Sequence, residues 1–234
     1  QPGENRIALR LDTTENASVP PFGFVIDYLC YGGLYREVTL EVREKTHIEQ
    51  ILIENTAADE ISVRIELSDK TDTKLLSEIR DSGGNITASA IGESYTLSVP
   101  DAKLWSVDDP YLYTLSAKII DAKDVLDEMS VRFGFRSARF ENDGFYLNGE
   151  KIKLRGINRH QSFAYVGYAM PESMQKRDAD ILKHELGVNA VRTSHYPQSQ
   201  HFLDRCDELG ILVFTEIPGW QHIGNEEWKK QAVE

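Results

Sequence analysis

The sequence predicts a multidomain chain in which β structure is followed by α/β structure, and three patterns carry this prediction. Apolar and polar residues alternate from about residue 41 to residue 136, which is the period of half-buried strands. Turn-forming residues separate these runs at short intervals. After about residue 144 the rhythm becomes strand, helix, strand, helix, strand, which is typical of a parallel sheet.

Residues 1–41 contain two short alternating runs, which we expect to be strands. They extend from Arg6 to Leu11 and from Gly33 to Val42, with a turn at Pro20-Pro21 and an aromatic stretch, Phe22 to Tyr35, between them. Because the alternation is already under way at the start, we expect the chain to be a piece of a longer protein.

Residues 42–137 predict an immunoglobulin-like β-sandwich, since roughly seven short strands in about 100 residues are typical of that architecture. The absence of a Cys-Trp-Cys set argues against a true immunoglobulin domain. The expected strands include Ile48–Ile53, Ile61–Leu67, Tyr95–Val99, Leu112–Ile120 and Met129–Phe135, and the expected turns lie at residues 57–60, 82–85 and 108–110.

Residues 138–234 predict alternating strands and helices. Strands are expected at Lys153–Ile157, Asn189–Thr193 and Ile211–Phe214. One helix presents Met174, Ile181, Leu182 and Leu186 on one face and ends at Gly187; the second presents Phe202, Leu203, Cys206 and Leu209 and ends at Gly210. Three parallel strands cannot close a barrel, which takes about 250 residues, so we expect an unpaired sheet edge.

The composition excludes several functional classes. A formal net charge of −12, spread along the chain, argues against a nucleic-acid partner. No apolar run approaches the roughly 20 residues of a membrane span, so no membrane partner is expected. Cys30 and Cys206 are interpreted as buried free thiols. They leave the compartment undecided between cytoplasmic and periplasmic or secreted, and no signal peptide is visible.

Polar, aromatic and ionisable residues follow each predicted strand of the third region. In parallel α/β folds, function gathers at the carboxyl ends of the strands. A rim of this kind suits sugars, which need hydrogen bonds to hydroxyls and an aromatic face. The candidates are Asn158, Arg159, His160 and Gln161 after the first strand, Ser194, His195, Tyr196 and Pro197 after the second, and Glu216, Pro218 and Trp220 after the third.

Four ordered motifs resemble glycoside hydrolase family 2, the β-galactosidase and β-glucuronidase type. They are Asp27 with Gly32-Gly33-Leu34-Tyr35-Arg36; Leu104-Trp105-Ser106 with Asp109-Pro110-Tyr111-Leu112-Tyr113; Phe133-Gly134-Phe135-Arg136; and Gly156-Ile157-Asn158-Arg159-His160 with Asn189-Ala190-Val191-Arg192-Thr193-Ser194-His195-Tyr196-Pro197. The resemblance covers nearly the whole chain. It implies the end of a sugar-binding jelly roll at 1–41, the sandwich at 42–137 and the first βα units of a (β/α)8 TIM barrel at 138–234.

The resemblance also implies roles for particular residues. Asp27 matches an aspartate that reaches into the sugar pocket, while His160 and His195 match histidines that bind the sugar and its transition state. Arg192 matches an arginine that orders the catalytic carboxylates. Asn158, in the first strand-end motif, and Glu216, at the third strand end, complete the expected substrate-binding set. Gln161 departs from the glutamate that many relatives carry.

The implied reaction is hydrolysis of terminal β-linked sugars with retention, and it needs two carboxylic acids about 5 Å apart. We expect both beyond residue 234, so that the chain itself has no catalytic residue and is inactive. Asn225-Glu226 resembles an acid/base motif, but Asn followed by two acids is better interpreted as a helix start. No cofactor is expected in this chain; a cation in the full-length enzyme stays open.

Other interpretations compete with these. Spacing of His195 and His201 matches no zinc motif, whereas His160 and His195 as structural histidines is a serious alternative. Arg159 favours a β-galactoside substrate, because glucuronidase relatives often carry Lys there. The rival functions are a non-catalytic carbohydrate-binding or adhesion module and a structural fragment that pairs with another chain. A homo-oligomer is compatible with the sequence.

Overall fold

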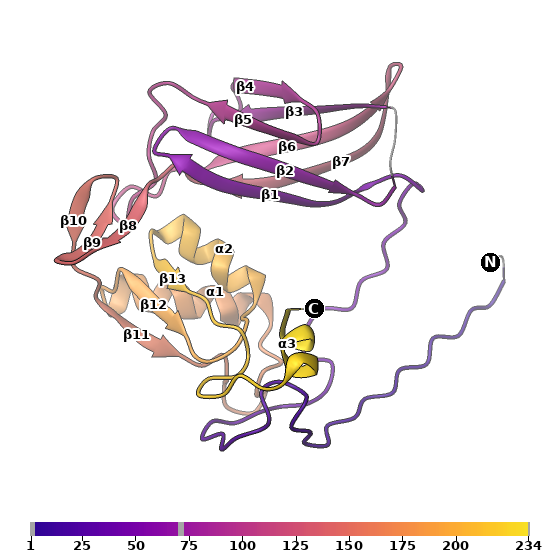
Figure 1. Ribbon diagram of the computed structural model, residues 1–234, viewed down its shortest axis with the longest axis vertical. Coiled ribbons are helices and arrows are strands. Elements are labelled where there is room, and N and C mark those ends of the chain that lie inside the picture. The colour runs from indigo at the N-terminus through magenta and orange to yellow at the C-terminus, as the bar shows by residue number, and fades with distance from the viewer. Residues whose placement is uncertain (1–2, 70–72, 234) are drawn as a thin grey trace.

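A computed structural model describes residues 3–69 and 73–233. A β-sandwich lies above an α/β unit, residues 156–233, and a small antiparallel sheet lies beside both (Figure 1). The polypeptide before the sandwich runs along the far side of the α/β unit, next to its last helix (Figure 1). In the described residues no helix is long and apolar enough to cross a membrane.

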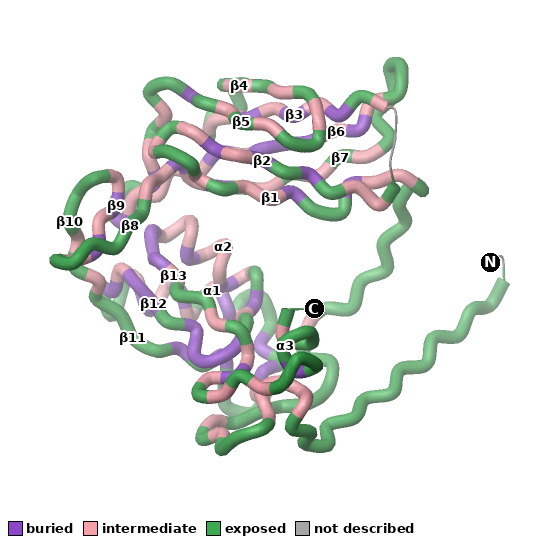
Figure 2. The backbone as a smooth tube through the Cα atoms, in the orientation of Figure 1, coloured by how far each residue is buried: buried purple, intermediate pink, exposed green. Residues whose placement is uncertain are grey.

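The sandwich consists of two antiparallel sheets. Its strands are β1 (Ile48–Ala57), β2 (Glu60–Leu67) and β5 (Ser94–Ser98) in one sheet, and β4 (Ile86–Ile91), β3 (Lys74–Arg80), β6 (Tyr113–Asp121) and β7 (Asp124–Phe133) in the other. Alternate residues of each strand point inward, so that Ile61, Val63 and Ile65 of β2 are all buried. The predicted period-two strands are therefore confirmed, and their buried faces form the largest core (Figure 2).

Three short strands between the sandwich and the α/β unit were absent from the predicted elements. They are β8 (Ala138–Glu141), β9 (Gly144–Leu147) and β10 (Glu150–Ile152), paired in the order β10-β9-β8. The sequence does carry one signal for them: Asn148-Gly149, with positive φ at both residues, connects β9 to β10. Asn-Gly is the strongest short-range hairpin signal, but strands of three or four residues show little periodicity.

The α/β unit is built on a parallel sheet. Its elements are β11 (Gly156–Arg159), α1 (Glu172–Asp180) with a π-helical turn η1 (Ile181–Glu185), β12 (Ala190–Thr193), α2 (Gln200–Leu209), β13 (Leu212–Phe214) and α3 (Glu226–Val233). The strand order is β11-β12-β13, all parallel. Within the described chain β11 and β13 each have one unpaired edge, as expected.

Two details of this unit differ from the predictions. The first strand begins at Gly156 rather than Lys153, because Leu154 packs with the core formed around the β8–β10 hairpins. Leu186 does not share the buried helical face: it is 57% exposed. The cause is the π-helical turn, in which the amide of Leu186 bonds to the carbonyl of Ile181 and rotates the following residues off the expected face.

The two strands predicted before the sandwich are wrong. Residues 3–46 contain no strand, and the alternating apolar side chains there are exposed, for example Ile7 (84%) and Leu40 (88%). A strand requires ladder partners for its amides and carbonyls, and no described strand pairs with these runs to supply them. In Figure 2 most of this stretch is exposed, with half-buried residues at 18–22 and at a few single positions.

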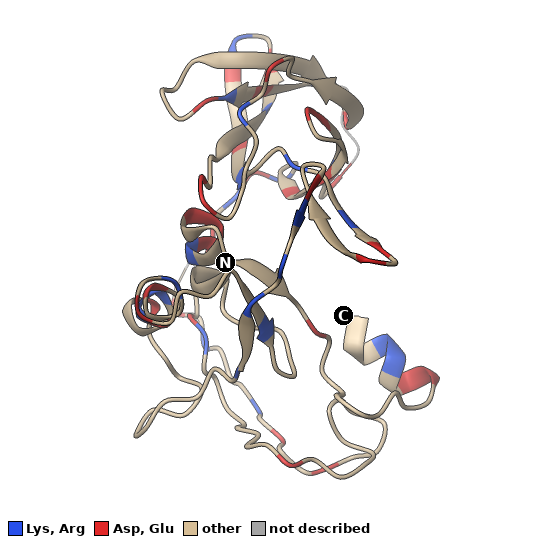
Figure 3. Ribbon diagram, turned by 90° about the vertical axis from the view of Figure 1, so that its left-hand side faces the viewer, with Lys and Arg blue, Asp and Glu red and all other residues tan. Residues whose placement is uncertain are grey.

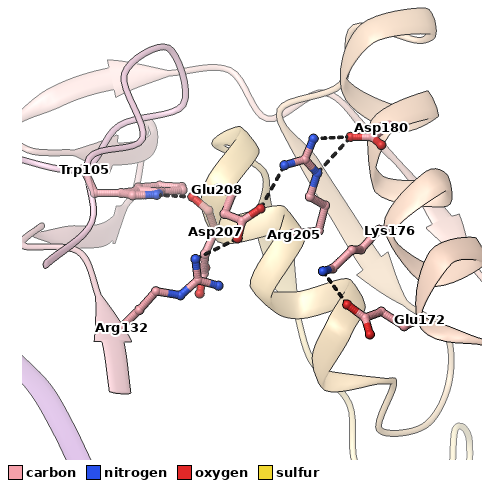
Figure 4. Close-up of polar contacts among 8 residues, drawn as sticks. All are labelled: Trp105, Arg132, Glu172, Lys176, Asp180, Arg205, Asp207 and Glu208. Carbon is pink, nitrogen blue, oxygen red and sulfur yellow. Dashed lines mark hydrogen bonds and ion pairs between the residues drawn. The ribbon is translucent and has the colours of Figure 1, made fainter. Parts of the chain in front are cut away.

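Trp105 joins the sandwich to the α/β unit. Its side chain is 1% exposed, and its indole Nε1 donates to the carbonyl of Asp207 in α2 at 2.8 Å. Close by, Arg132 of β7 pairs with Glu208 at 2.7 Å, and Arg205 bridges Glu208 to Asp180 (Figure 4). Acidic and basic residues are interspersed over all parts of the chain in Figure 3. The two units therefore meet through a buried indole flanked by ion pairs.

Gly210 provides a test of this junction. It ends α2 with φ +73, and a Cβ there would lie 2.4 Å from the backbone oxygen of Val107. Gly187 has a similar φ of +64, with no atom within 4 Å of its Cβ position. Gly187→Ala should cost about 1–2 kcal/mol, for the left-handed backbone alone. Gly210→Ala should cost about 1–3 kcal/mol more, because backbone cannot move aside cheaply. If urea denaturation showed the same loss in free energy of unfolding for both variants, the close approach of Gly210 to Val107 at the junction would be contradicted.

Candidate functional site

The parallel register places the ends of three strands at one edge. Asn158 of β11 lies opposite Arg192 of β12, and Arg192 lies opposite Phe214 of β13. The three strands therefore end at the same level, and each is followed there by a loop. His160, His195 and Glu216 follow within three residues of these positions, and the structure brings all three predicted side chains together.

Glu216 links two of the predicted residues. Its Oε1 pairs with Nε of Arg192, and its Oε2 lies 3.2 Å from Nδ1 of His195. A carboxylate only accepts hydrogen bonds, so Nδ1 of His195 carries the proton. In the neutral ring Nε2 is then an acceptor. His195 is 8% exposed and stacks on Trp220 at 5.3 Å between ring centroids.

His160 lies beside His195, with 5.2 Å between their ring centroids. Its Nδ1 is 3.4 Å from the hydroxyl of Tyr196, which also accepts the amide of Gln161 at 3.2 Å. Desolvation and the neighbouring His195 lower the pKa of His160, while Asp27 and Glu216 act in the opposite direction. When one of the two histidines, His160 and His195, is protonated, a positive charge on the other is therefore disfavoured.

The polypeptide before the sandwich completes the cluster. The ring of Tyr28 lies 5.6 Å from His160 and 5.5 Å from His195. Burial raises the pKa of Tyr28 to about 12, so its hydroxyl stays protonated. Among the described residues that hydroxyl has no hydrogen-bond partner. Asp27 is exposed and acts on both Tyr28 and His160 electrostatically.

Several contacts hold this polypeptide, residues 12–37 (hereafter the N-terminal segment), across the strand ends. The hydroxyl of Tyr168 donates to the carbonyl of Leu29 at 2.6 Å. Arg36 donates to the side chain of the fully buried Gln161. The indole of Trp228 in α3 donates to a backbone carbonyl of the segment at 3.1 Å. The segment is thus anchored on the first loop and the last helix of the α/β unit.

Asn158 and Arg159 point to opposite faces of the sheet. Asn158 is exposed and lines a shallow cavity of about 270 Å3 with Arg192. Arg159 is 5% exposed and faces the helices, where it donates to Asp178 at 2.7 Å and lies 3.9 Å from the ring centroid of Phe202. Gln175 and Gln198 accept from the same guanidinium. Arg159 therefore belongs to the packing behind the sheet and not to the cluster.

Sequence reasoning missed the aromatic residues at the centre of the site. The signal for Tyr28 in the sequence is its place directly after Asp27, within the aromatic stretch. Tyr196 was noted only as a strand-end residue, and Tyr168, whose ring lies 5.0 Å from that of Tyr196, was not noted. Cys30, predicted to be buried, is exposed near this cluster, whereas Cys206 is buried as expected; both are free thiols.

Two other candidates lie outside the cluster. Asn225 accepts the amide of Trp228 at 2.9 Å and so begins α3, which confirms the helix-start interpretation. Glu226 is solvent-exposed in the first turn and pairs with Lys229. Throughout residues 3–69 and 73–233, no three His, Cys, Asp or Glu side chains are grouped so as to hold a metal ion.

Family profiles match both halves of the chain. The profile described as glycosyl hydrolases family 2 matches residues 37–136, and the TIM barrel domain of the same family matches residues 138–232. The chain belongs to glycosyl hydrolase family 2. The predicted resemblance is thereby confirmed, including the TIM barrel assignment of the α/β region.

Curated relatives and solved structures that are similar to the chain include β-galactosidases and β-glucuronidases. It is 45% identical, over 99% of its length, to a β-galactosidase of Thermoanaerobacter pseudethanolicus, and 47% identical, over 97%, to one of Thermoanaerobacterium thermosulfurigenes. It covers 33% and 34% of those proteins, so this family 2 chain spans about a third of their length. A β-glucuronidase of Bacteroides uniformis matches 94% of the chain with a TM-score of 0.80 and 38% identity, and the chain covers 29% of it.

The titration of His160 tests the geometry of the cluster. NMR of the imidazole protons should give a pKa below the ordinary value of 6.5. The unfolded chain binds more protons between the lowered pKa and the ordinary one, so His160 should lower stability as pH falls through that window. His195→Gln should raise the pKa of His160, because it removes a neighbouring charge. Asp27→Asn should lower it further. Shifts of the same sign in both variants would contradict the arrangement.

Proposed function

We propose that this chain supplies part of the sugar pocket of a retaining β-glycosidase that hydrolyses terminal β-linked sugars. The observation that carries the proposal is the convergence of His160, His195 and Glu216, from three successive strand ends, on Asp27 and Tyr28 of the N-terminal segment. Enzymes built on TIM barrels gather their chemistry at this end of the strands.

His195 and His160 are assigned to hydroxyls of the sugar. With its Nδ1 proton directed at Glu216, His195 presents Nε2 to a sugar hydroxyl. His160, held near neutrality by its surroundings, offers a second imidazole. Hydrogen bonds of this kind strengthen as the sugar ring becomes oxocarbenium-like. Trp220, stacked on His195, adds an aromatic face.

Asp27, Asn158 and Arg192 complete the proposed pocket. Asp27 is an exposed carboxylate beside His160, suited to accept from a sugar hydroxyl. Asn158 and Arg192 stand side by side on the open face of the sheet. Arg192 holds Glu216 in place and carries a positive charge at the point where the retaining mechanism needs its carboxylates ordered.

The domain assignment belongs to the same proposal. We assign residues 1–41 to the end of a sugar-binding jelly roll, 42–137 to an immunoglobulin-like sandwich and 138–234 to the first βα units of the barrel. The seven antiparallel strands and the three parallel ones support the last two assignments. The exposed apolar side chains of residues 6–11 and 33–42 support the first, since contact with the rest of a larger domain would bury them.

Hydrolysis with retention requires a nucleophile and an acid/base about 5 Å apart. We propose that both come from outside residues 1–234, and that this chain alone is inactive. Glu216 is already engaged by Arg192 and His195, and Glu226 is a solvent-exposed residue of a helix start. A β-galactoside is the proposed substrate, supported by the two β-galactosidases at 45% and 47% identity.

Calorimetry with methyl β-galactoside tests the pocket directly. The chain should bind the sugar, and Asp27→Ala should weaken binding by about tenfold or more, because a hydrogen bond to a charged group contributes about 1.5–3 kcal/mol. Asp124→Ala, which removes an exposed aspartate of the β6–β7 hairpin, is the matched control and should bind like the parent chain.

The alternatives give different results. Binding by residues 42–137 alone would indicate a carbohydrate-binding or adhesion module, and no binding at millimolar sugar would favour a structural fragment. A chromogenic β-galactoside should show no turnover with this chain. Clear turnover would disprove the proposed origin of the carboxylates.

A further inference from the structure

A cavity of about 380 Å3 lies at the opposite end of the parallel strands from the histidines. Three parts of the chain form it: residues 107–108 of the loop before β6, residues 152–155 before β11, and residues of the π-helical turn and of the loop before β12. β11 begins at Gly156 and β12 at Ala190, so the cavity adjoins the amino ends of both strands. It shares no residue with the proposed sugar pocket at their carboxyl ends.

The wall of this cavity carries an excess of positive charge. Lys153, Arg155 and Lys183 all line it, and Asp108 is the one acidic residue among the described residues of the wall. Three positive charges and one negative charge give a local charge of +2, in a chain whose net charge is −12. We call it the basic cavity.

The cations of the basic cavity are not neutralised by the chain. Most described lysines and arginines form an ion pair with a carboxylate. Within residues 3–69 and 73–233, Lys153, Arg155 and Lys183 form none, although acids outnumber cations in the sequence. Three unpaired cations in one concave site favour an anionic ligand.

The ammonium group of Lys183 is already held in position by the backbone. Its Nζ donates to the carbonyl of Val107 at 2.5 Å and to the carbonyl of Gly210 at 3.3 Å. An ammonium group has three N–H donors, so one donor is left for a ligand. Because the half-buried side chain is ordered before a ligand arrives, binding loses less conformational entropy there.

Asn189 holds the backbone between the other two cations. Its side-chain oxygen accepts the amide of Arg155 at 2.7 Å, and its Nδ2 donates to the carbonyl of Lys153 at 3.0 Å. Leu154, between them, packs in the core around the β8–β10 hairpins. Lys153 and Arg155 therefore both line the basic cavity, and both are exposed to solvent.

This set of donors fits the phosphate group better than a carboxylate. The planar guanidinium of an arginine can donate two parallel hydrogen bonds to phosphate oxygens, and lysines bind phosphate as point charges. A phosphate dianion also matches the local charge of +2, whereas a carboxylate would neutralise half of it. A water molecule occupies about 30 Å3, so a cavity of 380 Å3 has room for more than a phosphate group alone.

We propose that the basic cavity binds a phosphate group, either as the free anion or as part of a small phosphomonoester. The inference does not depend on the proposed sugar pocket, because the two sites lie at opposite ends of the strands. A failure of either one leaves the other unaffected.

Calorimetry with methyl phosphate tests the basic cavity in the whole chain. At about pH 8 methyl phosphate is a dianion, and it should bind saturably in the millimolar range or more tightly. Arg155→Gln should weaken binding about tenfold or more, because it removes a charge-assisted hydrogen bond. Lys123→Gln removes an exposed cation from the turn between β6 and β7, and this matched control should bind like the parent chain.

Asp108→Asn provides a test with the opposite sign. It removes the one negative charge from the wall, so it should tighten binding of methyl phosphate by about threefold or more. A purely structural role of this aspartate would leave the affinity unchanged or lower it. An unchanged or weaker affinity in Asp108→Asn would therefore contradict the basic cavity as the site.

The remaining outcomes are also distinct. The absence of saturable binding would overturn the proposal, and so would equal weakening by Arg155→Gln and Lys123→Gln, which would indicate an effect of net charge alone. Acetate that competes as well as methyl phosphate at equal ionic strength would assign the cavity to carboxylates instead. Inorganic phosphate that binds as tightly as methyl phosphate would support the free anion, and weaker binding of inorganic phosphate would support the phosphomonoester.

Far-UV circular dichroism checks that each variant is folded. Lys153→Gln changes a second exposed cation of the basic cavity, and it should also weaken binding of methyl phosphate. If Arg155→Gln failed to fold, Lys153→Gln would decide in its place, and full affinity in that variant would overturn the proposal.

Discussion

The parallel pairing of three short strands is the constraint on which the site depends. Each strand has only three or four residues, yet the register sets Asn158, Arg192 and Phe214 side by side. The carboxyl ends of parallel strands lie on the same side of a sheet. The residues that follow the strands are therefore brought close together by strand pairing alone, with no need for direct contacts among them. His160 and Glu216 each come two residues after a register position. The contacts of Glu216 with Arg192 and His195 then fix the position of Glu216 relative to His195.

The second half of the site comes from more than a hundred residues earlier in the chain. The N-terminal segment has no helix or strand to hold it, and its position depends on side-chain contacts with the α/β unit. Buried Gln161 has a particular part in this, because its side chain accepts from Arg36. Gln161 is thus one of the residues that join the N-terminal segment to the barrel region.

The sequence predicted those features that repeat and missed those that depend on partners. The period of two in Ile61, Val63 and Ile65 sufficed for the sandwich, and Gly210 correctly marked the end of a helix. The same alternation in residues 6–11 was misleading. Periodicity indicates that a segment has one apolar face, but it does not show whether another strand is present to pair with that segment. The clustering of His160, His195 and Glu216 followed from the strand-end rule, whereas Tyr28 could be placed only by the packing of a segment without periodic structure. No pattern in the sequence predicted the π-helical turn that exposes Leu186.

The burial of Arg159 has a consequence for the two residues beside it, Asn158 and His160. Its guanidinium is shared by Asp178, Gln175 and Gln198 and lies against Phe202, so two helices and a loop are joined behind β11 by a single side chain. The residues before and after it, Asn158 and His160, face the opposite side. A lysine has one compact ammonium group and cannot keep so many separated contacts. A substitution at this hidden position would therefore act on the direction of its two neighbours from behind the sheet, without changing a side chain on their face.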